Sequence, residues 1–127
     1  MYVGIIGART RNDLSDYILV QKALEDLMTR YNDREIIIVS GGANRGGDRF
    51  AKHLAMVKSL EYMEFRPEFR DKDASGFFEE YYKRNRMIAF VSDELIACVH
   101  NDGKKGGTGY TIDRFKEYHP ETPVIEV

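Results

Sequence analysis

Short apolar runs alternate with longer amphipathic segments along the whole chain, and this alternation is the feature that most constrains the fold. Five runs are strand-like, and they span residues 2–6, 35–39, 61–65, 95–99 and 123–127. Runs that alternate with helical segments are typical of βαβ units, in which helices connect parallel strands. The run 35–39 is apolar at consecutive positions, as expected of a strand that helices cover on both faces. The sequence therefore predicts an α/β fold, a three-layer sandwich with a mainly parallel sheet of about five strands.

The segments between the runs show helical periodicity. After Asp13, a residue type that caps helices, apolar side chains recur every three or four residues at Tyr17, Val20, Leu24, Leu27, Met28 and Tyr31. Further helices are predicted from Asp48, from Ser75 and over residues 111–118, and residues 101–109 are predicted to form a glycine-rich loop. Each predicted helix follows a predicted strand, which is the connection that a parallel sheet needs.

The length and the single cysteine limit the class of protein. The chain has 127 residues, the size of one domain, and shows no internal repeat, low-complexity tract or linker, so we expect a single domain over residues 1–127. Cys98 is the only cysteine, which excludes an intrachain disulfide and a cysteine-based zinc site and favours a reducing, cytoplasmic location. The three histidines lack metal-ligand spacing, so we expect neither a metal nor a cofactor.

Charge and hydropathy argue against two kinds of partner. Lys plus Arg number 19 and Asp plus Glu number 21, and this net charge of −2 is not typical of strong nucleic-acid binding, which needs many contacts to phosphates. No apolar run approaches the roughly 18 residues of a membrane span. The stretch Met1–Ile6 is too short for a signal peptide and lacks a basic flank. We therefore expect no membrane association.

Three loops rich in glycine or arginine follow predicted strands, at residues 7–11, 40–48 and 103–109. In an open parallel sheet, ligands bind beyond the carboxyl ends of the strands, where the strand order reverses. Glycine in such loops lets a phosphate approach backbone N–H groups, and a helix that starts after the loop adds partial positive charge. A plain turn with solvated side chains is the alternative for each loop. Neither the Walker A pattern nor the dinucleotide fingerprint is present, which disfavours a P-loop nucleotidase and a standard dehydrogenase.

A fourth segment, residues 83–87, places polar side chains in an otherwise apolar helix. Arg84 and Asn85 interrupt the apolar face, which indicates either a solvated face or contact with the ligand. His100 ends the fourth run and is expected near the same edge of the sheet. The predicted ligand-binding residues are Gly7, Arg9, Ser40, Gly41, Gly42, Arg45, Gly46, Gly47, Asp48, Arg84, Asn85, Arg86, Gly106, Gly107, Thr108 and Gly109.

The order of these motifs resembles the SLOG superfamily, and the resemblance extends over nearly the whole chain. It rests on Gly7-Ala8-Arg9, on Ser40-Gly41-Gly42-Ala43 with Gly46-Gly47-Asp48-Arg49, on Arg84-Asn85-Arg86-Met87 and on Gly106-Gly107-Thr108-Gly109. The chain is similar in particular to the small bacterial and phage branch related to YspA and YpsA. The superfamily includes LOG phosphoribohydrolases, the DNA-uptake protein DprA and molybdenum-cofactor carriers. The resemblance implies a Rossmann-like fold and a nucleotide or nucleotide-derived ligand held by the glycine loops.

One function that fits the resemblance is a binding module, which senses or carries the ligand without chemistry. The loop glycines would supply backbone donors, Arg9, Arg45 and Arg86 would neutralise phosphate, and Asn85 would orient the ribose or base. Related enzymes are often dimers, so a homodimer is also implied. A DNA-processing role like that of DprA is disfavoured by the near-neutral net charge.

The alternative function is a nucleotide N-glycosidase like the LOG enzymes, with Asp113 as the catalytic residue and an arginine on the phosphate. LOG enzymes carry the motif P-G-G-x-G-T-x-x-E. Here Lys105 stands in place of the proline, Tyr110 in place of the threonine and Asp113 in place of the glutamate. Because aspartate is one methylene shorter than glutamate, its carboxylate would fall short of the reacting centre, and binding without chemistry is the primary hypothesis.

Overall fold

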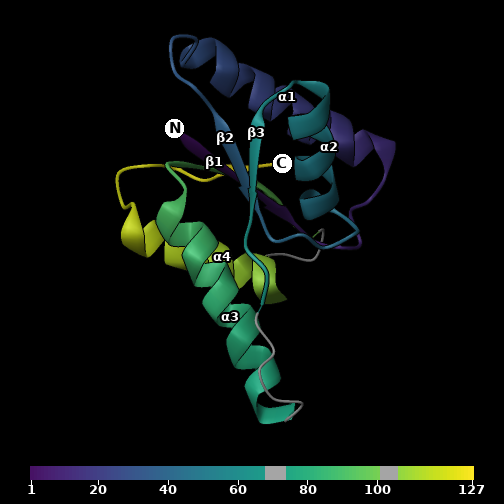
Figure 1. The fold of residues 1–127 in the computed structure, drawn as a ribbon, viewed down its shortest axis with the longest axis vertical. Helices are drawn as coiled ribbons and strands as arrows, with labels where there is room; N and C mark the ends of the chain where they lie inside the picture. The colour runs from purple at the N-terminus through teal and green to yellow at the C-terminus, as the bar shows by residue number, and fades with distance from the viewer. Residues whose placement is uncertain (68–73, 101–105) are drawn as a thin grey trace.

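Strands and helices alternate along the chain, as the apolar runs predict. The computed structural model describes residues 1–67, 74–100 and 106–127, with the backbone alone at 74–78 (Figure 1). The elements in order are β1 (Tyr2–Gly7), α1 (Leu14–Arg30), β2 (Ile37–Ser40), α2 (Gly47–Val57), β3 (Glu61–Glu64), α3 (Ala74–Val91), β4 (Glu94–Cys98), α4 (Gly106–Tyr118) and β5 (Ile125–Glu126). All five strands are parallel and lie in the order β3-β2-β1-β4-β5. The predicted Rossmann-like α/β sandwich is confirmed.

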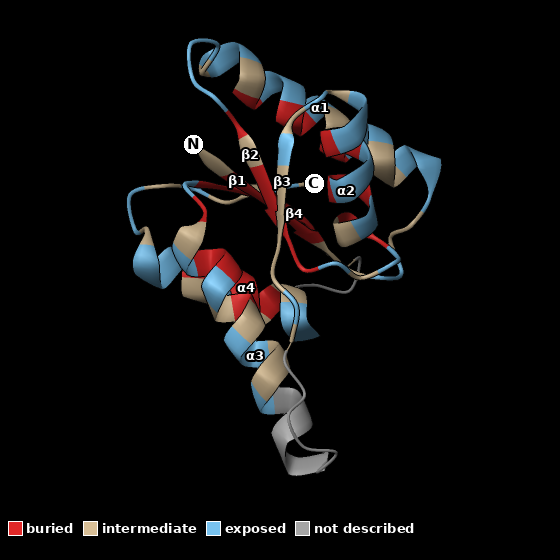
Figure 2. Cartoon of the chain, in the orientation of Figure 1, coloured by how far each residue is buried: buried red, intermediate tan, exposed pale blue. Residues whose placement is uncertain are grey.

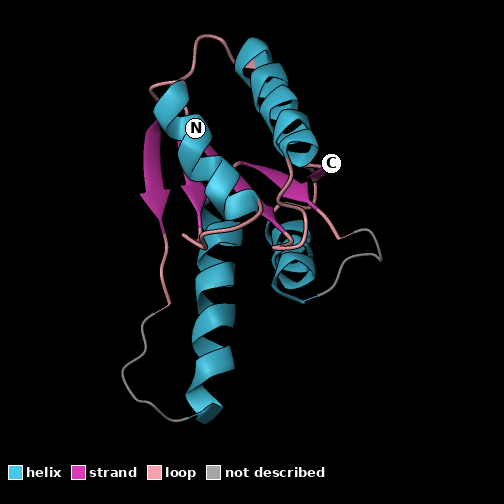
Figure 3. Cartoon of the chain, turned by 90° about the vertical axis from the view of Figure 1, so that its right-hand side faces the viewer, coloured by secondary structure: helices cyan, strands magenta, loops and turns pink. Residues whose placement is uncertain are grey.

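Helices cover both faces of the sheet and create two buried clusters (Figures 1 and 3). On one face Ile5 of β1 belongs to a cluster with Leu24 of α1, and on the other Ile6 belongs to a cluster with Ile88 of α3 and Phe115 of α4. Successive side chains of a strand point to opposite faces, so β1 buries neighbouring residues in different clusters. Figure 2 shows the buried residues concentrated in the strands and on the sides of the helices that face them. This double coverage explains the unbroken apolar runs of the sequence.

The element boundaries differ from the predicted ones mainly at the carboxyl end of the chain. Helix α4 starts at Gly106, so the residues predicted as loop up to Gly109 form its first turn. Strand β5 is shorter than the apolar run 123–127. At the start of α1, Asp13 occupies the predicted N-cap position, and its N–H donates to the Asp16 carboxylate at 3.2 Å. None of the helices in the described residues is both long enough and apolar enough to span a membrane.

The strand order reverses between β1 and β4. From β1 the chain continues outward to β2 and β3, then crosses the sheet to β4 on the other side of β1. The last residues of these two strands, Gly7 and Cys98, are register partners, so both strands end at one place. Helix α3 extends past the carboxyl ends of the strands (Figure 3). A reversal of this kind is where open parallel sheets bind ligands.

Candidate functional site

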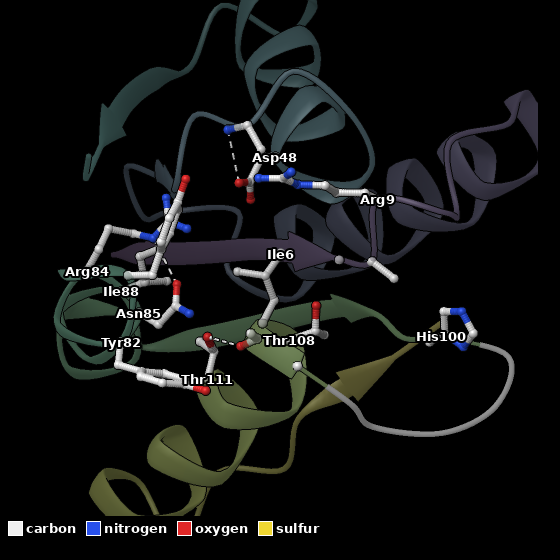
Figure 4. Close-up of a pocket in the computed structure, with 16 residues that line it drawn as sticks. Ile6, Arg9, Asp48, Tyr82, Arg84, Asn85, Ile88, His100, Thr108 and Thr111 are labelled. Carbon is white, nitrogen blue, oxygen red and sulfur yellow. Dashed lines mark hydrogen bonds between the residues drawn. The ribbon is translucent and has the colours of Figure 1, made fainter. Parts of the chain in front are cut away.

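A cavity of about 590 Å³ lies at the carboxyl edge of the sheet, at the reversal point between β1 and β4 (Figure 4). Its volume falls in the range of about 300–1,000 Å³ that is usual for small-molecule sites. The described residues that line it come from the end of β1 with the loop after it, from the β2–α2 region, from α3, and from His100 and the first turns of α4. The structure thus brings parts of all three predicted loops and of the predicted helix segment together.

Gly7 at the end of β1 and Ala8 and Arg9 in the loop after it belong to the cavity wall. The N–H of Ala8 donates to the last carbonyl of β4 at 2.9 Å, which fixes the loop against the neighbouring strand. The guanidinium of Arg11 is already paired with Asp16 at 2.9 Å. Arg9 is exposed, and in the described part of the chain it has no hydrogen-bond or ion-pair partner. Its charge is therefore available to an anion at the mouth of the cavity.

Polar groups of the β2–α2 region form hydrogen bonds with other parts of the protein. Asp48 accepts hydrogen bonds from the Ser40 hydroxyl at 2.8 Å and from the Ala43 N–H at 3.1 Å. The N–H of Gly46 donates to the side-chain oxygen of Asn12 at 2.8 Å. Ala43 and Asp48 line the cavity. The other predicted ligand-binding residues of this segment lie outside the lining, and they are Ser40, Gly41, Gly42, Arg45, Gly46 and Gly47.

Gly47 has a packing role that explains the need for glycine at this point. A Cβ on Gly47 would overlap main-chain atoms of Ile6 and Gly7, because α2 begins in direct contact with the end of β1. The absence of a side chain permits this close approach. Because α2 starts so close to β1, the next residue, Asp48, lies at the edge of the cavity.

One face of α3 forms a wall of the cavity. Tyr81, Arg84, Asn85 and Ile88 share this face at helical spacing, and Tyr82 joins them in the lining. Asn85 is only 7% exposed, and a buried amide requires hydrogen-bond partners. Its oxygen accepts from Arg84 Nε–H at 2.8 Å. Its nitrogen points into the cavity (Figure 4), and no described residue accepts a hydrogen bond from it.

Arg86, the other predicted arginine of this segment, contacts α4 instead of the cavity. Its guanidinium donates to the Tyr110 hydroxyl at 3.0 Å. That hydrogen bond raises the pKa of Arg86 above its ordinary value. Arg86 is not part of the lining, so of the two arginines it is Arg84 that reaches the cavity.

The first turn of α4 closes the cavity on the side opposite the β2–α2 region. Gly106, Gly107 and Thr108 line it, and the N–H groups of a first helical turn have no acceptors within the helix. The positive end of the helix dipole lies at the same place. Thr111, also in the lining, donates to the Gly107 carbonyl at 2.7 Å. Gly109 is buried and lies outside the lining. No described residue accepts a hydrogen bond from the Gly107 or Thr108 N–H, so this turn offers donors to an anion.

His100 follows β4 and completes the lining on this side. The sequence placed it near the site, and the structure brings its side chain to the cavity (Figure 4). The remaining residues of the third predicted loop, 103–105, lie outside the described residues.

Asp113, the predicted catalytic residue, lies outside the cavity. It is exposed on α4 and is not part of the lining. It follows the cavity-lining Thr111 by two positions, and two residues of an α-helix rotate a side chain by about 200°. The two side chains therefore leave the helix on opposite sides. Within the described residues, the carboxylate that lines the cavity belongs to Asp48.

Several lining residues were not selected from the sequence as ligand contacts. Ile6 and Ile88 supply apolar surface, Tyr82 supplies an aromatic wall, and Thr111 supplies a hydroxyl. For Thr111, the helical period of the sequence could have given the signal. Thr108 was selected, and Thr111 lies three residues later on the same face of α4.

The assembled site presents N–H donors and cationic side chains around one carboxylate, an arrangement that suits an anionic ligand which also carries hydroxyl groups. Among the residues that the structure describes, no group of three or more His, Cys, Asp or Glu side chains could hold a metal ion. No protein-family model, no curated protein and no solved structure matches this chain.

Proposed function

We propose that the cavity binds a nucleotide or nucleotide-derived ligand through its phosphate and performs no chemistry on it. The observation that carries the proposal is the convergence on one cavity of donors that no described residue uses. The buried amide nitrogen of Asn85 and the first-turn N–H groups of Gly107 and Thr108 meet there. Phosphate oxygens accept several such hydrogen bonds at once, and the start of a helix favours their negative charge.

The other walls of the cavity fit the remaining parts of such a ligand. Asp48 is a carboxylate with acceptor capacity for a sugar hydroxyl. Tyr82 packs against Tyr110 with ring centroids 4.5 Å apart, and an aromatic wall of this kind offers a stacking surface to a base. Arg9 adds positive charge at the mouth. These contacts support a ligand that combines phosphate, sugar and base.

We also propose that the chain is a SLOG-type domain. The proposal is supported by the order of the four motifs in the sequence together with a Rossmann-like sheet whose parallel strands end at one edge. A sensor or carrier is favoured over a phosphoribohydrolase because Asp113, which replaces the glutamate of the LOG motif, lies outside the cavity.

A thermal-shift screen with matched ligand pairs tests the proposal. AMP is compared with adenosine and ribose 5-phosphate with ribose, and ADP-ribose and cyclic dinucleotides complete the set. A ligand present at 100 times its Kd stabilises the fold by about 2.7 kcal/mol. We expect the phosphorylated member of a pair to raise Tm and its partner to leave Tm unchanged. Equal shifts within each pair, or no shift with any compound, would contradict the proposal.

Chromatography of each stabilising ligand after incubation tests the absence of chemistry. We expect the ligand to be recovered unchanged, and Asp113→Asn to bind it as the wild type does. Release of a free base together with a ribose phosphate, lost in Asp113→Asn, would instead establish the glycosidase.

A further inference from the structure

The guanidinium of Arg84 lies between two acceptors of the protein itself. Its Nη1 donates to the Gly41 carbonyl at 2.6 Å, and its Nε donates to the Asn85 side-chain oxygen at 2.8 Å. The same group lies 5.4 Å from the centre of the Tyr81 ring, a cation–π contact. Arg84 therefore connects α3 to the β2–α2 loop, and two of its three nitrogens are used within the protein.

The position of Gly41 shows how closely the guanidinium is fitted. A Cβ on Gly41 would lie 2.7 Å from Cζ of Arg84, closer than real Cβ contacts. A glycine at this position leaves the space in which the planar guanidinium reaches both acceptors. The position of the Arg84 guanidinium therefore depends on the glycine in the loop as well as on α3.

The hydrogen bond from Arg84 determines which end of the Asn85 amide faces the cavity. A guanidinium N–H can only donate, so its partner on Asn85 must be the oxygen. The amide nitrogen is then directed to the other side, where a Cβ on Gly107 would lie 3.1 Å from it. Asn85 therefore presents two N–H groups, and no acceptor, beside the first turn of α4.

We infer that Arg84 is a positioning residue, which holds Asn85 as a fixed donor and thereby selects ligands with a hydrogen-bond acceptor at this point. The inference rests on the proposed function and names the part of the ligand that this corner of the cavity recognises. A phosphate or carboxylate oxygen accepts from the Asn85 amide, beside the first turn of α4. An ammonium or guanidinium group, which can only donate, finds no acceptor on this side of Asn85.

Proton NMR of the ligand-free protein tests the positioning directly. In the wild type, the Arg84 Nε–H is expected to exchange slowly with water, and the Asn85 amide protons are expected to show an NOE to Gly107 Hα. In Arg84→Lys that NOE is expected to disappear, because an ammonium group is a point charge that cannot hold both acceptors in one plane. Gly41→Ala displaces the guanidinium without changing it and is expected to have the same effect. Fast exchange in the wild type, or an NOE that survives both variants, overturns the inference.

A double-mutant cycle with AMP as the probe separates positioning from direct contact with the ligand. Arg84→Lys keeps the positive charge, and Arg84→Lys and Asn85→Ala are each expected to weaken binding about tenfold, the loss of one charge-assisted hydrogen bond. If Arg84 acts through Asn85, the double variant binds no more weakly than Asn85→Ala alone, within about twofold. A double variant weaker by about a hundredfold shows additive effects and means that Arg84 touches the ligand itself, which overturns the inference.

Arg34→Lys is the matched control, because Arg34 is exposed in the turn after α1 and lies outside the cavity lining. It is expected to leave AMP affinity and the Asn85 NOE unchanged. If the wild type binds neither AMP nor any other compound of the screen, the proposed function fails, and the NMR experiment still decides whether Arg84 orients Asn85.

Discussion

Replacing Asn85 by aspartate changes one atom of the cavity wall and reverses what that atom offers to a ligand. The amide nitrogen becomes a carboxylate oxygen of similar size, so no void is created. The donor to the ligand is lost and a negative charge takes its place. On the protein side the carboxylate stays within reach of Arg84, whose Nε lies 2.8 Å from the existing Asn85 oxygen. The affinity for the ligand is therefore expected to fall, whereas the contact with Arg84 that supports the fold is expected to be kept.

The expected loss of affinity follows from the lost hydrogen bond. A hydrogen bond to a charged group contributes about 1.5–3 kcal/mol, which is about 10- to 150-fold in Kd. Repulsion between the new carboxylate and the phosphate adds to this loss, so about tenfold is the smallest effect expected for Asn85→Asp. Lowering the pH protonates the new carboxyl group and removes its charge. The difference in Kd from the wild type is therefore expected to narrow as the pH falls.

Isothermal titration with AMP at neutral and acidic pH measures the affinity, and urea unfolding measures the stability of the same samples. The control is Asn32→Asp, which makes the same substitution in the exposed turn after α1, away from the cavity. We expect the control to bind as the wild type does. If Asn85→Asp also binds AMP within about twofold of the wild type at neutral pH, one charge-assisted hydrogen bond has not been lost, and Asn85 does not donate to the ligand.

Three further predictions concern the fold. Gly47→Ala is expected to reduce the free energy of unfolding in urea by about 1–3 kcal/mol, because its Cβ meets main-chain atoms at the end of β1 that cannot move aside. Burial raises the pKa of Glu64, but the hydrogen bonds from Arg66 and Tyr62 lower it by a larger amount. The pKa of Glu64 in the folded state therefore lies below the ordinary value. Such a group stabilises the fold above its unfolded pKa, and the stabilisation is lost as pH falls through the folded pKa. The wild type is therefore expected to be more stable than Glu64→Gln at neutral pH, with the difference narrowing in acid, and a constant difference would refute this account. Burial raises the pKa of the Cys98 thiol, so the native protein is expected to react with a thiol reagent far more slowly than the unfolded chain at the same pH.

The fold was predictable because its central strands, β1, β2 and β4, are buried on both faces. Ile5 and Ile6 contribute to different clusters, so the sequence shows an unbroken apolar run where a half-exposed strand would alternate. The start of α4 was not predictable in the same way. Gly106, Gly107 and Gly109 have low intrinsic helix propensity, and local sequence favours a loop there. In the structure, packing of Ile112 and Phe115 against the sheet outweighs that local preference.

The candidate site was predictable to the level of which loops meet, but not to the level of which atoms face the cavity. The rule that ligands bind at the carboxyl ends of strands drew attention to Arg9, and the polar break in an apolar helix drew attention to Asn85; both residues line the cavity. It could not show that the Gly46 N–H is already bonded to Asn12, because that contact joins residues 34 positions apart. Nor could the position of Asp113, which stands where the LOG motif has a glutamate, show the direction of its side chain, which depends on how α4 is rotated against the sheet.

The internal bonding of the β2–α2 loop has a consequence for the entropy of binding. The N–H groups of Ala43 and Gly46 are satisfied by Asp48 and Asn12 without a ligand, so this wall keeps its shape in the empty protein. Immobilising a mobile side chain on binding costs about 0.5–1.5 kcal/mol, and a wall that is already ordered avoids that cost. In the proposed complex, the loop that the sequence suggested as a flexible phosphate cradle would serve as an ordered wall, and most of the entropy lost on binding would be that of the ligand.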